Sequence, residues 1–239
     1  MTSATLQQPA RTPWNAWLAM ARISNTPTVA SNVLAGAALA GMVQPRPEFA
    51  LLVLSAVVLY TAGMVLNDVC DFGWDRLHRP DRPLVQGSVS YRAALTVAIG
   101  LLALGGLLLL PLGLAPFLAG LLLIGFIVLY DVWHKSNPLS PLVMAMCRLM
   151  VYVIAFVTFA LPPNLLLALG GGALVLYLVI LTAIAKRGAP GNVVALLIAG
   201  ISLLDAVVLT VMQAPVAWIA VAVLCFGLTL FFQRYVEGT

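Results

Sequence analysis

Half of the acidic side chains in this sequence lie within one short stretch. Residues 67–90 read NDVCDFGWDRLHRPDRPLVQGSVS and include Asp68, Asp71, Asp75 and Asp81, four of the eight Asp and Glu residues in the chain. If one helix runs through Asp75, then Asp68, Asp71 and Asp75 share a helical face, because they are three and four residues apart. Carboxylates stacked in this way repel one another, and a divalent cation is the simplest group that relieves the repulsion. The spacing therefore predicts a cation site.

Asn67 and three arginines extend this pattern toward phosphate chemistry. Asn67 adds an amide oxygen four residues before Asp71. Hard oxygen ligands suit Mg²⁺, which commonly shares a phosphate with its protein site. Arg76, Arg79 and Arg82 follow directly, and guanidinium groups bind phosphate oxygens in forked pairs. The alternative interpretation is a solvated loop of mixed charge, which the acidic spacing alone does not exclude.

The composition predicts that these residues belong to an integral membrane protein. Of the 239 residues, 62% are hydrophobic and 8% are charged, against about 25% charged residues in an average soluble domain. A soluble chain needs more polar residues to cover its surface, so a cytosolic enzyme is excluded. The net charge of +4 comes with no basic run longer than Lys186–Arg187, which argues against nucleic-acid binding. The three cysteines form no C-x-x-C pair, so neither a structural disulfide nor a zinc site is expected.

Charges and helix-breaking residues divide the chain into eight apolar segments. A membrane-spanning helix needs about 20 residues, and the two longest uncharged runs are interrupted by PLGLAP at 111–116 and LPPN at 161–164. The predicted fold is an all-α, polytopic membrane bundle that forms one domain over 1–239, including a cytoplasmic tail at 1–14. The eight expected spans lie near 15–42, 49–67, 92–111, 115–133, 139–161, 165–186, 191–212 and 215–235.

Basic residues fall on alternate connections between these segments. One side of the membrane receives Arg11, the arginines of 76–82, Lys135 and Lys186, whereas the other side receives Arg46. The positive-inside rule therefore places both termini and the charged loops in the cytoplasm. Two termini on the same side of the membrane require an even number of spans, which agrees with the eight predicted spans. The expected location is the inner (plasma) membrane, with a multi-pass topology.

Two charged residues interrupt the predicted spans. Arg148 lies about two turns into the segment 139–161, and Asp205 lies in the middle of 191–212. An unpaired charge is costly inside a bilayer. Arg148 is therefore expected to meet an anionic partner or ligand, and Asp205 either to bind substrate or to contact Arg148 across the bundle.

The acidic stretch also resembles a known motif. The order N-D-x-x-D-x-x-x-D, followed by R-P-x-R-P-L and a Gly, is similar to the first aspartate-rich motif of the UbiA superfamily of intramembrane prenyltransferases. The eight predicted helices extend this resemblance over nearly the whole chain. It implies that Mg²⁺ binds here and holds the diphosphate of an isoprenoid donor. The positions that match the metal ligands are Asn67, Asp68, Asp71 and Asp75, with Asp68 and Asp71 assigned to catalysis and Arg79 and Arg82 to diphosphate binding.

The resemblance includes the loop between the fourth and fifth predicted helices, where the family carries a Tyr and basic residues that face the diphosphate. The matching positions here are Tyr130, Asp131, Lys135, Asn137 and Arg148. Lys135 and Arg148 are assigned to catalysis and the others to substrate binding. The alternative for Tyr130 is an interfacial aromatic belt shared with Trp133. His134 is expected to be a polar residue at the level of the lipid headgroups rather than a catalytic base.

One family feature is missing. Typical members carry a second motif, D-x-x-x-D, in the loop after the sixth helix, whereas this loop reads ILTAIAKRGAPGN (180–192) without an acidic residue. Lys186 and Arg187 stand there instead, either as substrate-binding groups that neutralise the diphosphate or as a positive-inside anchor. This departure, together with M-x-x-C-R at 144–148, is similar to a divergent, EboC-type subgroup.

The resemblance implies a membrane-embedded, Mg²⁺-dependent prenyltransferase. It would transfer a prenyl or polyprenyl group from its diphosphate to a hydrophobic acceptor, such as an aromatic or secondary-metabolite precursor. The expected partners are this donor, the acceptor and the lipid bilayer, with no nucleic acid. The alternative is a non-catalytic UbiA-like protein that binds or carries a lipid or metabolite. A divalent-cation transporter is disfavoured, because its acids would line a path at the midplane instead of one edge.

Overall fold

The computed structural model describes residues 13–44, 46–135, 137–160, 162 and 164–236, and within these ranges every regular element is a helix. The all-α prediction is therefore confirmed. Arg11 and most of the expected tail at 1–14 lie outside the described residues. In chain order the elements are α1 (Pro13–Met20), η1 (Ile23–Asn25), α2 (Thr26–Leu39), α3 (Pro47–His78), α4 (Tyr91–Leu107), η2 (Leu110–Leu112), α5 (Leu114–Trp133), α6 (Ser140–Phe159), α7 (Leu165–Lys186), α8 (Gly191–Val211) and α9 (Val216–Phe232).

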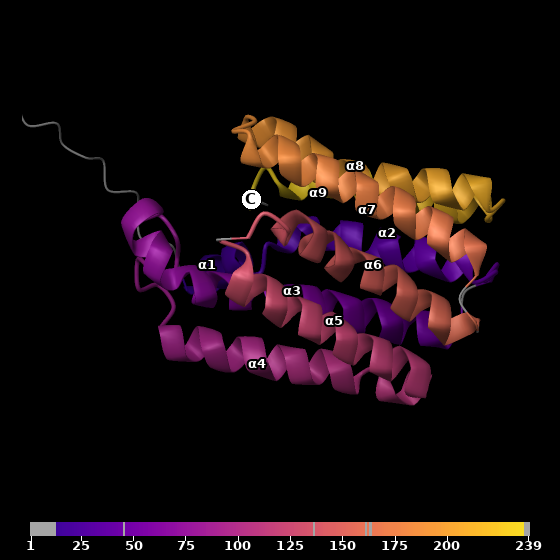
Figure 1. Ribbon diagram of the computed structural model, residues 1–239, viewed down its shortest axis with the longest axis horizontal. Coiled ribbons are helices and arrows are strands. Elements are labelled where there is room, and N and C mark those ends of the chain that lie inside the picture. Colours follow the sequence, from indigo (N-terminus) through magenta and orange to yellow (C-terminus); the bar gives the residue numbers. More distant parts are fainter. Residues whose placement is uncertain (1–12, 45, 136, 161, 163, 237–239) are drawn as a thin grey trace, which may run out of the picture.

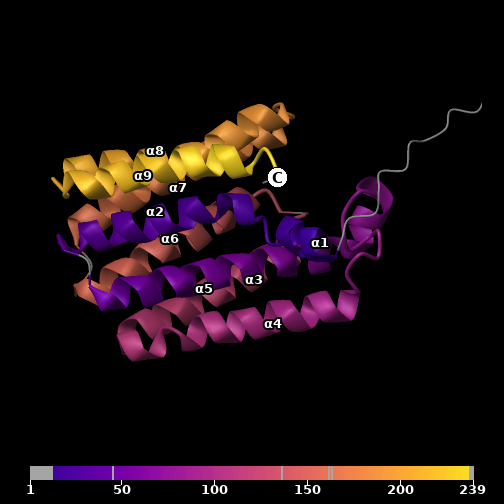
Figure 2. The same cartoon turned by 180° about the vertical axis from the view of Figure 1, so that it is seen from behind.

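The helices α2 to α9 run alternately in opposite directions along one long axis (Figures 1 and 2). The centre of the bundle is α2, which packs against α3, α6, α8 and α9. Nearly all of its residues are buried, and its side chains are small or medium-sized. On one side of this helix α3 packs against α4 and α5, and on the other α7, α8 and α9 complete the bundle. The central helix therefore joins two groups of helices.

The backbones of α2 and α6 come unusually close at Gly36. A Cβ atom placed there would lie 2.7 Å from the carbonyl oxygen of Tyr152 and 2.8 Å from the Cβ of Ala155. Only glycine permits this approach, as at other close contacts between membrane helices. The two helices run in the same direction (Figure 1). One turn earlier on each, Asn32 and Arg148 therefore face one another.

Six of the helices are long and apolar enough to cross a membrane: Pro47–His78, Tyr91–Leu112, Leu114–Trp133, Ser140–Phe159, Leu165–Lys186 and Gly191–Val211. The helix α9 is also apolar but has 17 residues, and α2 has 14. At about 1.5 Å per residue, α2 is shorter than a hydrocarbon core of about 30 Å. The polytopic helical fold is confirmed, whereas the number of eight spans stays a prediction.

The first expected span, 15–42, is wrong as one continuous helix. The helix α1 ends at Met20, Arg22 takes a left-handed conformation with φ of 43°, and α2 begins at Thr26. Pro27 lies in the first turn of α2. Proline has no N–H to donate and its ring would clash with the preceding turn, so a helix can begin here but cannot continue through. The break directs the Arg22 side chain toward the interior.

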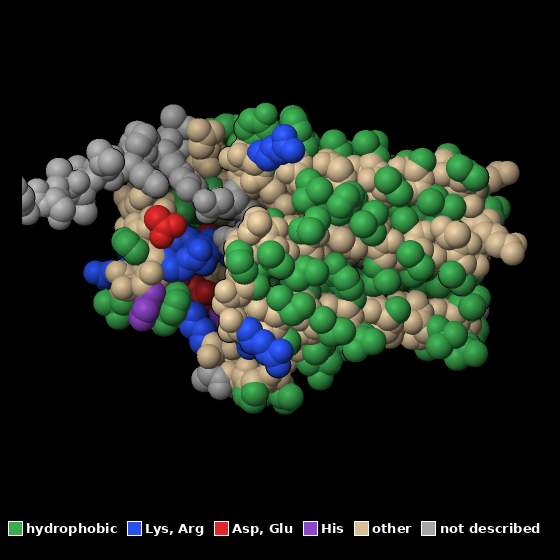
Figure 3. Space-filling view, turned by 90° about the horizontal axis from the view of Figure 1, so that it is seen from above, with side chains coloured by type: hydrophobic (Ala, Val, Ile, Leu, Met, Phe, Trp, Pro, Cys, Tyr) green, Lys and Arg blue, Asp and Glu red, His purple; other side chains and the backbone are tan. Residues whose placement is uncertain are grey.

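Three connections that carry charged residues lie at one end of the bundle, whereas Arg46, at the start of α3, lies at the other end (Figure 1). Figure 1 shows the segment between α3 and α4, the connection between α5 and α6, and the connection between α7 and α8 at the same end as α1 and the last described residues. Figure 3 shows Lys and Arg side chains gathered at this end, with hydrophobic side chains along the rest of the visible face. The expected grouping of basic loops is present, and its cytoplasmic orientation stays a prediction.

Candidate functional site

The acidic residues of α3 point into the protein at its charged end. Asn67, Asp68 and Asp75 are buried, with exposed fractions of 7%, 3% and 4%, and Asp71 is half-buried. The helix runs to His78 without interruption, so the predicted continuation through Asp75 is present. The aspartates therefore lie on one side of a regular helix, as their spacing requires.

Asp68 is held between two arginines that come from different segments. Its Oδ1 atom lies 3.5 Å from Nη1 of Arg82 and 3.7 Å from Nη2 of Arg22. Its second oxygen, Oδ2, is buried without a hydrogen-bond partner among the described residues. Burial lowers the pKa of the Arg82 guanidinium, although the carboxylate of Asp68 acts in the opposite direction. Arg82, one of the predicted diphosphate ligands, is thus already beside the acidic row.

Asp71 contacts the connection that follows α5. Its carboxylate lies 2.9 Å from Nζ of Lys135 and 3.4 Å from Nε2 of His134. The hydrogen bond with Asp71 raises the pKa of His134 above its usual value. Lys135 also lies 4.7 Å from the centre of the Trp74 ring, close enough for a cation–π contact. His134, expected only at headgroup level, therefore helps to attach this connection to α3.

A third buried carboxylate, that of Asp131 in α5, completes the acidic group. Nδ2 of Asn67 donates a hydrogen bond of 3.2 Å to Oδ1 of Asp131, and Oδ1 of Asn67 accepts one of 3.5 Å from Arg22. The other oxygen of Asp131 is buried and has no hydrogen-bond partner among the residues that the structure describes. Two predicted site residues from different helices therefore meet, and one carboxylate oxygen stays available to a ligand.

Arg22 was not predicted as a site residue, yet it contacts Asp68 and Asn67. A signal was available in the sequence. Arg22 lies seven residues inside the expected span 15–42, and the rule that a charge inside the bilayer needs a partner applies to it as it does to Arg148. Its contacts depend on the helix break before α2, which the hydrophobic pattern did not reveal.

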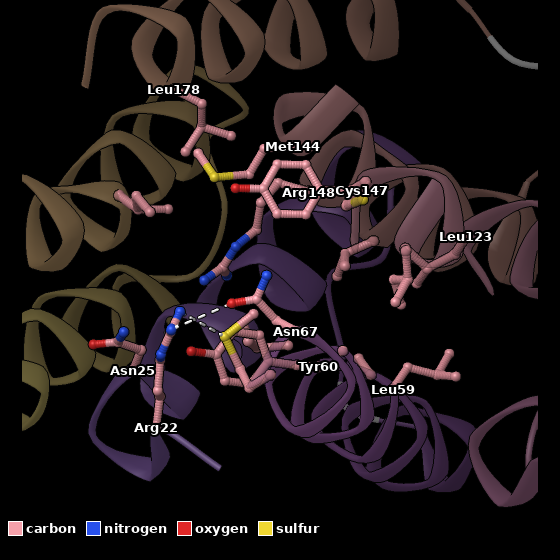
Figure 4. A pocket seen from close by; sticks show the side chains of 18 of the residues that line it. Arg22, Asn25, Leu59, Tyr60, Asn67, Leu123, Met144, Cys147, Arg148 and Leu178 are labelled. Carbon is pink, nitrogen blue, oxygen red and sulfur yellow. Dashed lines mark hydrogen bonds between the residues drawn. The ribbon is translucent and has the colours of Figure 1, made fainter. Parts of the chain in front are cut away.

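An apolar cavity of about 210 Å³ lies directly behind this charged group. Figure 4 shows Arg22 and Arg148 pointing into it from different walls, with Asn67 between them and apolar side chains around. Asn67 and Asp131 belong both to the acidic group and to the wall of the cavity. The site thus combines a charged mouth with an apolar interior, an arrangement suited to a ligand with an anionic head and a hydrocarbon tail.

The remaining residues at the end of α5 and in the loop that follows it have different environments. Tyr130 lines the cavity and its ring stacks on that of His134, with centroids 4.9 Å apart. Trp133 is exposed, as expected for an interfacial residue. Asn137 accepts a hydrogen bond of 2.8 Å from the backbone N–H of Leu139. Its carboxamide thus supports the start of α6, and Asn137 is not among the cavity-lining residues.

The basic residues that replace the second aspartate motif lie apart from the cavity wall. Lys186 donates a hydrogen bond of 2.8 Å to the Ser140 hydroxyl at the start of α6, and Arg187 is exposed. Neither belongs to the cavity lining in the described part of the chain. Arg79, the residue after α3, is half-buried. These contacts favour the anchoring interpretation of Lys186 over direct neutralisation of a ligand.

Arg148 and Asp205 are linked across the bundle, but not directly. Nη1 of Arg148 donates a hydrogen bond of 3.0 Å to Oδ1 of Asn32. Nδ2 of Asn32 in turn donates to both carboxylate oxygens of Asp205, at 3.1 and 2.9 Å. The expected contact between the two charges is therefore replaced by a contact through one amide.

The donor set at the mouth suits a magnesium ion shared with a ligand. Among the described residues no three His, Cys, Asp or Glu side chains are grouped closely enough to hold a metal by themselves. However, one oxygen of Asp68 and one of Asp131 are buried and unpartnered there. Mg²⁺ is usually held by one or two carboxylates together with substrate phosphates and water. The chemistry of these residues therefore fits Mg²⁺ that arrives with a phosphorylated ligand.

Comparisons with known proteins agree with this arrangement. A digeranylgeranylglyceryl phosphate synthase from Sulfolobus acidocaldarius is 34% identical over 116 residues, which are 48% of this chain and 42% of that protein. A 2-acylphloroglucinol 4-prenyltransferase from Humulus lupulus is 30% identical over 113 residues, 45% of this chain and 26% of that protein. The matched regions thus span less than half the length of these relatives.

The fold is shared with solved structures over almost the whole chain. A UbiA homolog from Archaeoglobus fulgidus, bound to GPP and Mg²⁺, has a TM-score of 0.63 at 16% identity, covering 92% of this chain and 86% of that one. At the level of sequence, residues 29–167 match the UbiA prenyltransferase family. This segment is more than half of the chain and contains the acidic row, Asp131 and Arg148. The predicted resemblance is therefore confirmed, and the chain is an integral membrane protein that belongs to the UbiA prenyltransferase family.

Proposed function

We propose that this protein is a Mg²⁺-dependent prenyltransferase that moves a prenyl or polyprenyl group from its diphosphate to a hydrophobic acceptor, such as an aromatic or secondary-metabolite precursor. The observation that carries the proposal is the position of the acidic row. Asn67 of α3 and Asp131 of α5 meet at the mouth of an apolar cavity, with Asp68 beside them. A diphosphate at the mouth would leave its isoprenoid tail inside the cavity.

Each group of side chains has a proposed role in holding the donor. The proposed metal ligands are Asn67, Asp68, Asp71 and Asp75, to which the structure suggests adding Asp131 because of its unpartnered oxygen. Bound Mg²⁺ would supply Lewis-acid stabilisation of the negative charge on the departing pyrophosphate. Arg82, Arg79 and Lys135 would bind further phosphate oxygens. Arg22 would orient Asn67 and Asp68, with which it is already in contact.

The apolar cavity has a separate role in the proposed reaction. The bond between the first prenyl carbon and the diphosphate oxygen breaks, a bond from that carbon to the acceptor forms, and the acceptor loses a proton. The reacting carbon becomes electron-poor, so water must be kept from it. Side chains such as Leu59, Leu123 and Leu178 line the cavity and would exclude water from the reacting carbon.

Release of pyrophosphate tests this proposal. Purified protein in nonionic detergent, supplied with Mg²⁺, isoprenyl diphosphates of several chain lengths and a panel of hydrophobic acceptors, is expected to release pyrophosphate. The variant Asp68→Asn should lower turnover at least about a hundredfold, because it removes a charge that faces the metal and diphosphate. Glu48→Gln is the matched control, since Glu48 is an exposed acid at the opposite end of the same helix.

A carrier that binds the donor without cleaving it is the second candidate. It is favoured by one observation: Asp68 and Asp71 are already paired with basic side chains, and the loop after α7 has no acid to hold a second metal. Binding of the radiolabelled donor in the presence of Mg²⁺, without pyrophosphate release for any acceptor or chain length, would establish the carrier and contradict the enzyme.

We also propose that the charged end faces the cytoplasm in the inner membrane, because the basic connections gather there. Cys70 offers a direct test, since it is exposed and lies within the acidic stretch. A membrane-impermeant maleimide should label Cys70 in inverted vesicles but not in intact cells. The opposite pattern of labelling would place this end outside.

A further inference from the structure

We propose that Arg148 forms an inner anion site in the cavity, which binds a carboxylate or phosphate group on the acceptor. The inference rests on the proposed function, because it assigns a substrate class to the same cavity. The acidic mouth would hold the donor diphosphate through metal, whereas the inner site would bind the acceptor through a guanidinium group alone.

The first observation is the position of Arg148. It lies eight residues after the start of α6 at Ser140, and it lines the cavity. The residue is neither fully buried nor exposed, and Figure 4 shows its side chain directed into the cavity. Its guanidinium carbon lies 5.3 Å from the centre of the Tyr60 ring, which supports one side of the group. The accessible part of Arg148 therefore faces the space where a ligand would lie.

The second observation is that the negative charge that balances Arg148, on Asp205, is separated from it by the side chain of Asn32. Asp205 is completely buried and accepts hydrogen bonds of 2.5 Å from both Ser31 and Tyr152. Its remaining contacts are with the Asn32 amide, whose other end accepts from Arg148. With each carboxylate oxygen already accepting two hydrogen bonds, Asp205 compensates the charge of Arg148 without occupying its N–H groups.

The third observation is the absence of a direct ion pair at Arg148. The ion pairs in the described part of the chain involve Arg22, Arg82, His134 and Lys135, and none includes Arg148 within 4.0 Å. A guanidinium group has five N–H donors, and the contact with Asn32 uses one. In a water-poor cavity the remaining donors favour a forked contact with an anion.

The surroundings of Arg148 indicate what else the ligand carries. The side chains of Met144, Val151, Leu178 and Ile201 line the same cavity and would contact an apolar body. The positive end of the Arg148–Asn32–Asp205 chain faces the cavity, so an anion is attracted there while a neutral ligand gains nothing from it. The inner site therefore fits an amphipathic acceptor with one anionic group.

Binding of short amphiphiles tests the inner site without any chemistry. Hexyl phosphate, hexanoate and hexanol are titrated calorimetrically into the protein in nonionic detergent, at fixed ionic strength and without donor or Mg²⁺. At least one of the two anions is expected to bind about tenfold or more tightly than hexanol, and the stronger of the two identifies a phosphate or a carboxylate as the preferred group. Arg148→Gln should remove this preference, whereas Arg46→Gln, at the opposite end of the bundle, should retain it.

Several results would overturn the proposal. One is equal affinity of the wild-type protein for hexanol and for both anions, which needs no variant. Another is an anion preference that survives Arg148→Gln and disappears in Arg82→Gln, since this would place the anion at the mouth. If Arg148→Gln does not fold, Arg148→Lys replaces it as the test, because lysine keeps the charge but lacks the forked pair of N–H donors. Arg148→Lys should weaken anion binding severalfold. Unchanged binding would contradict the proposal.

The donor provides the last control. Arg148→Gln should leave Mg²⁺-dependent binding of an isoprenyl diphosphate within about twofold of the wild type, and loss of that binding would assign Arg148 to the donor instead. Anion binding at Arg148 in a protein that never releases pyrophosphate would support the inner site while contradicting the prenyltransferase. The two proposals can therefore fail separately.

Discussion

The mouth and the interior of the cavity hold their charges in opposite ways. At the mouth, Asp71 pairs directly with Lys135 at 2.9 Å, and both side chains keep some contact with solvent. In the interior, Arg148 and Asp205 are separated by the amide of Asn32. The first arrangement is easily exchanged for contacts with a metal or a diphosphate. In the second, the carboxylate of Asp205 is fully hydrogen-bonded inside the protein, whereas Arg148 uses one N–H donor within the network and faces the cavity.

This difference is what lets the proposed donor and acceptor sites occupy one cavity. Half-exposed ion pairs contribute little to stability, because water and salt screen them. They can therefore open for a ligand at small cost. A buried charge must stay compensated at all times, so the interior can present a cation to the cavity only if its counter-charge is permanent. Asp205 provides this counter-charge from α8.

Removal of metal should separate the two regions most completely. Addition of EDTA in excess over Mg²⁺ is expected to reduce pyrophosphate release to background, because the diphosphate is held at the mouth by carboxylates only through a cation. The same treatment should leave binding of the short anions at Arg148 unchanged. Pyrophosphate assays and calorimetry on one EDTA-treated sample check both expectations, and continued turnover would contradict metal dependence.

Truncation of an aspartate in each region should have unequal effects on stability. Asp205→Ala is expected to lower the free energy of unfolding by about 3 kcal/mol, because it removes the buried counter-charge of Arg148 and leaves the buried donors of Ser31, Asn32 and Tyr152 without their acceptor. Asp71→Ala should cost less than about 1 kcal/mol, as for other partly exposed pairs. Unfolding in mixed detergent micelles measures both variants. Equal losses would contradict the distinction drawn between the regions.

Substitution of Lys135 should weaken donor binding without loosening the protein. Lys135→Ala is expected to raise the KM for the isoprenyl diphosphate about tenfold, since one charge-assisted contact to a phosphate is removed. The KM for the acceptor should change by less than about twofold. Steady-state kinetics with each substrate varied in turn provides the measurement, and a change confined to the acceptor would assign Lys135 to the other region.

The smallest effect is expected at Lys186, which lies outside both regions. Because its ammonium group donates to Ser140 at 2.8 Å, Lys186→Ala should change donor affinity by less than about twofold. Equilibrium binding of the donor with Mg²⁺ provides the test. A loss of tenfold or more would show that Lys186 takes the place of the missing second aspartate motif.

Local patterns in the sequence predicted much of the fold and of the mouth. The breaks at PLGLAP and LPPN and the continuation of one helix through Asp75 depend on residue type and spacing, and the structure contains them. The division of the first span at Arg22 was missed, because a hydrophobic pattern records burial and not the direction of the backbone. Lys186 hydrogen-bonds Ser140 and Asn137 accepts a hydrogen bond from Leu139, contacts that their spacing in the sequence did not reveal; their assignment to substrate binding stays a prediction.

The sequence by itself determined that the chain is a membrane-embedded helical bundle with an acidic row at one end, since composition and helical periodicity are local properties. Only the tertiary structure decided what that row meets. The contact of Asn67 with Asp131 joins residues 64 positions apart, and that of Asn32 with Asp205 joins residues 173 apart. Such pairings depend on which helices pack together: the first joins α3 to α5 and the second joins α2 to α8. The close approach of α2 and α6 that Gly36 permits brings Arg148 to the other end of the Asn32 amide.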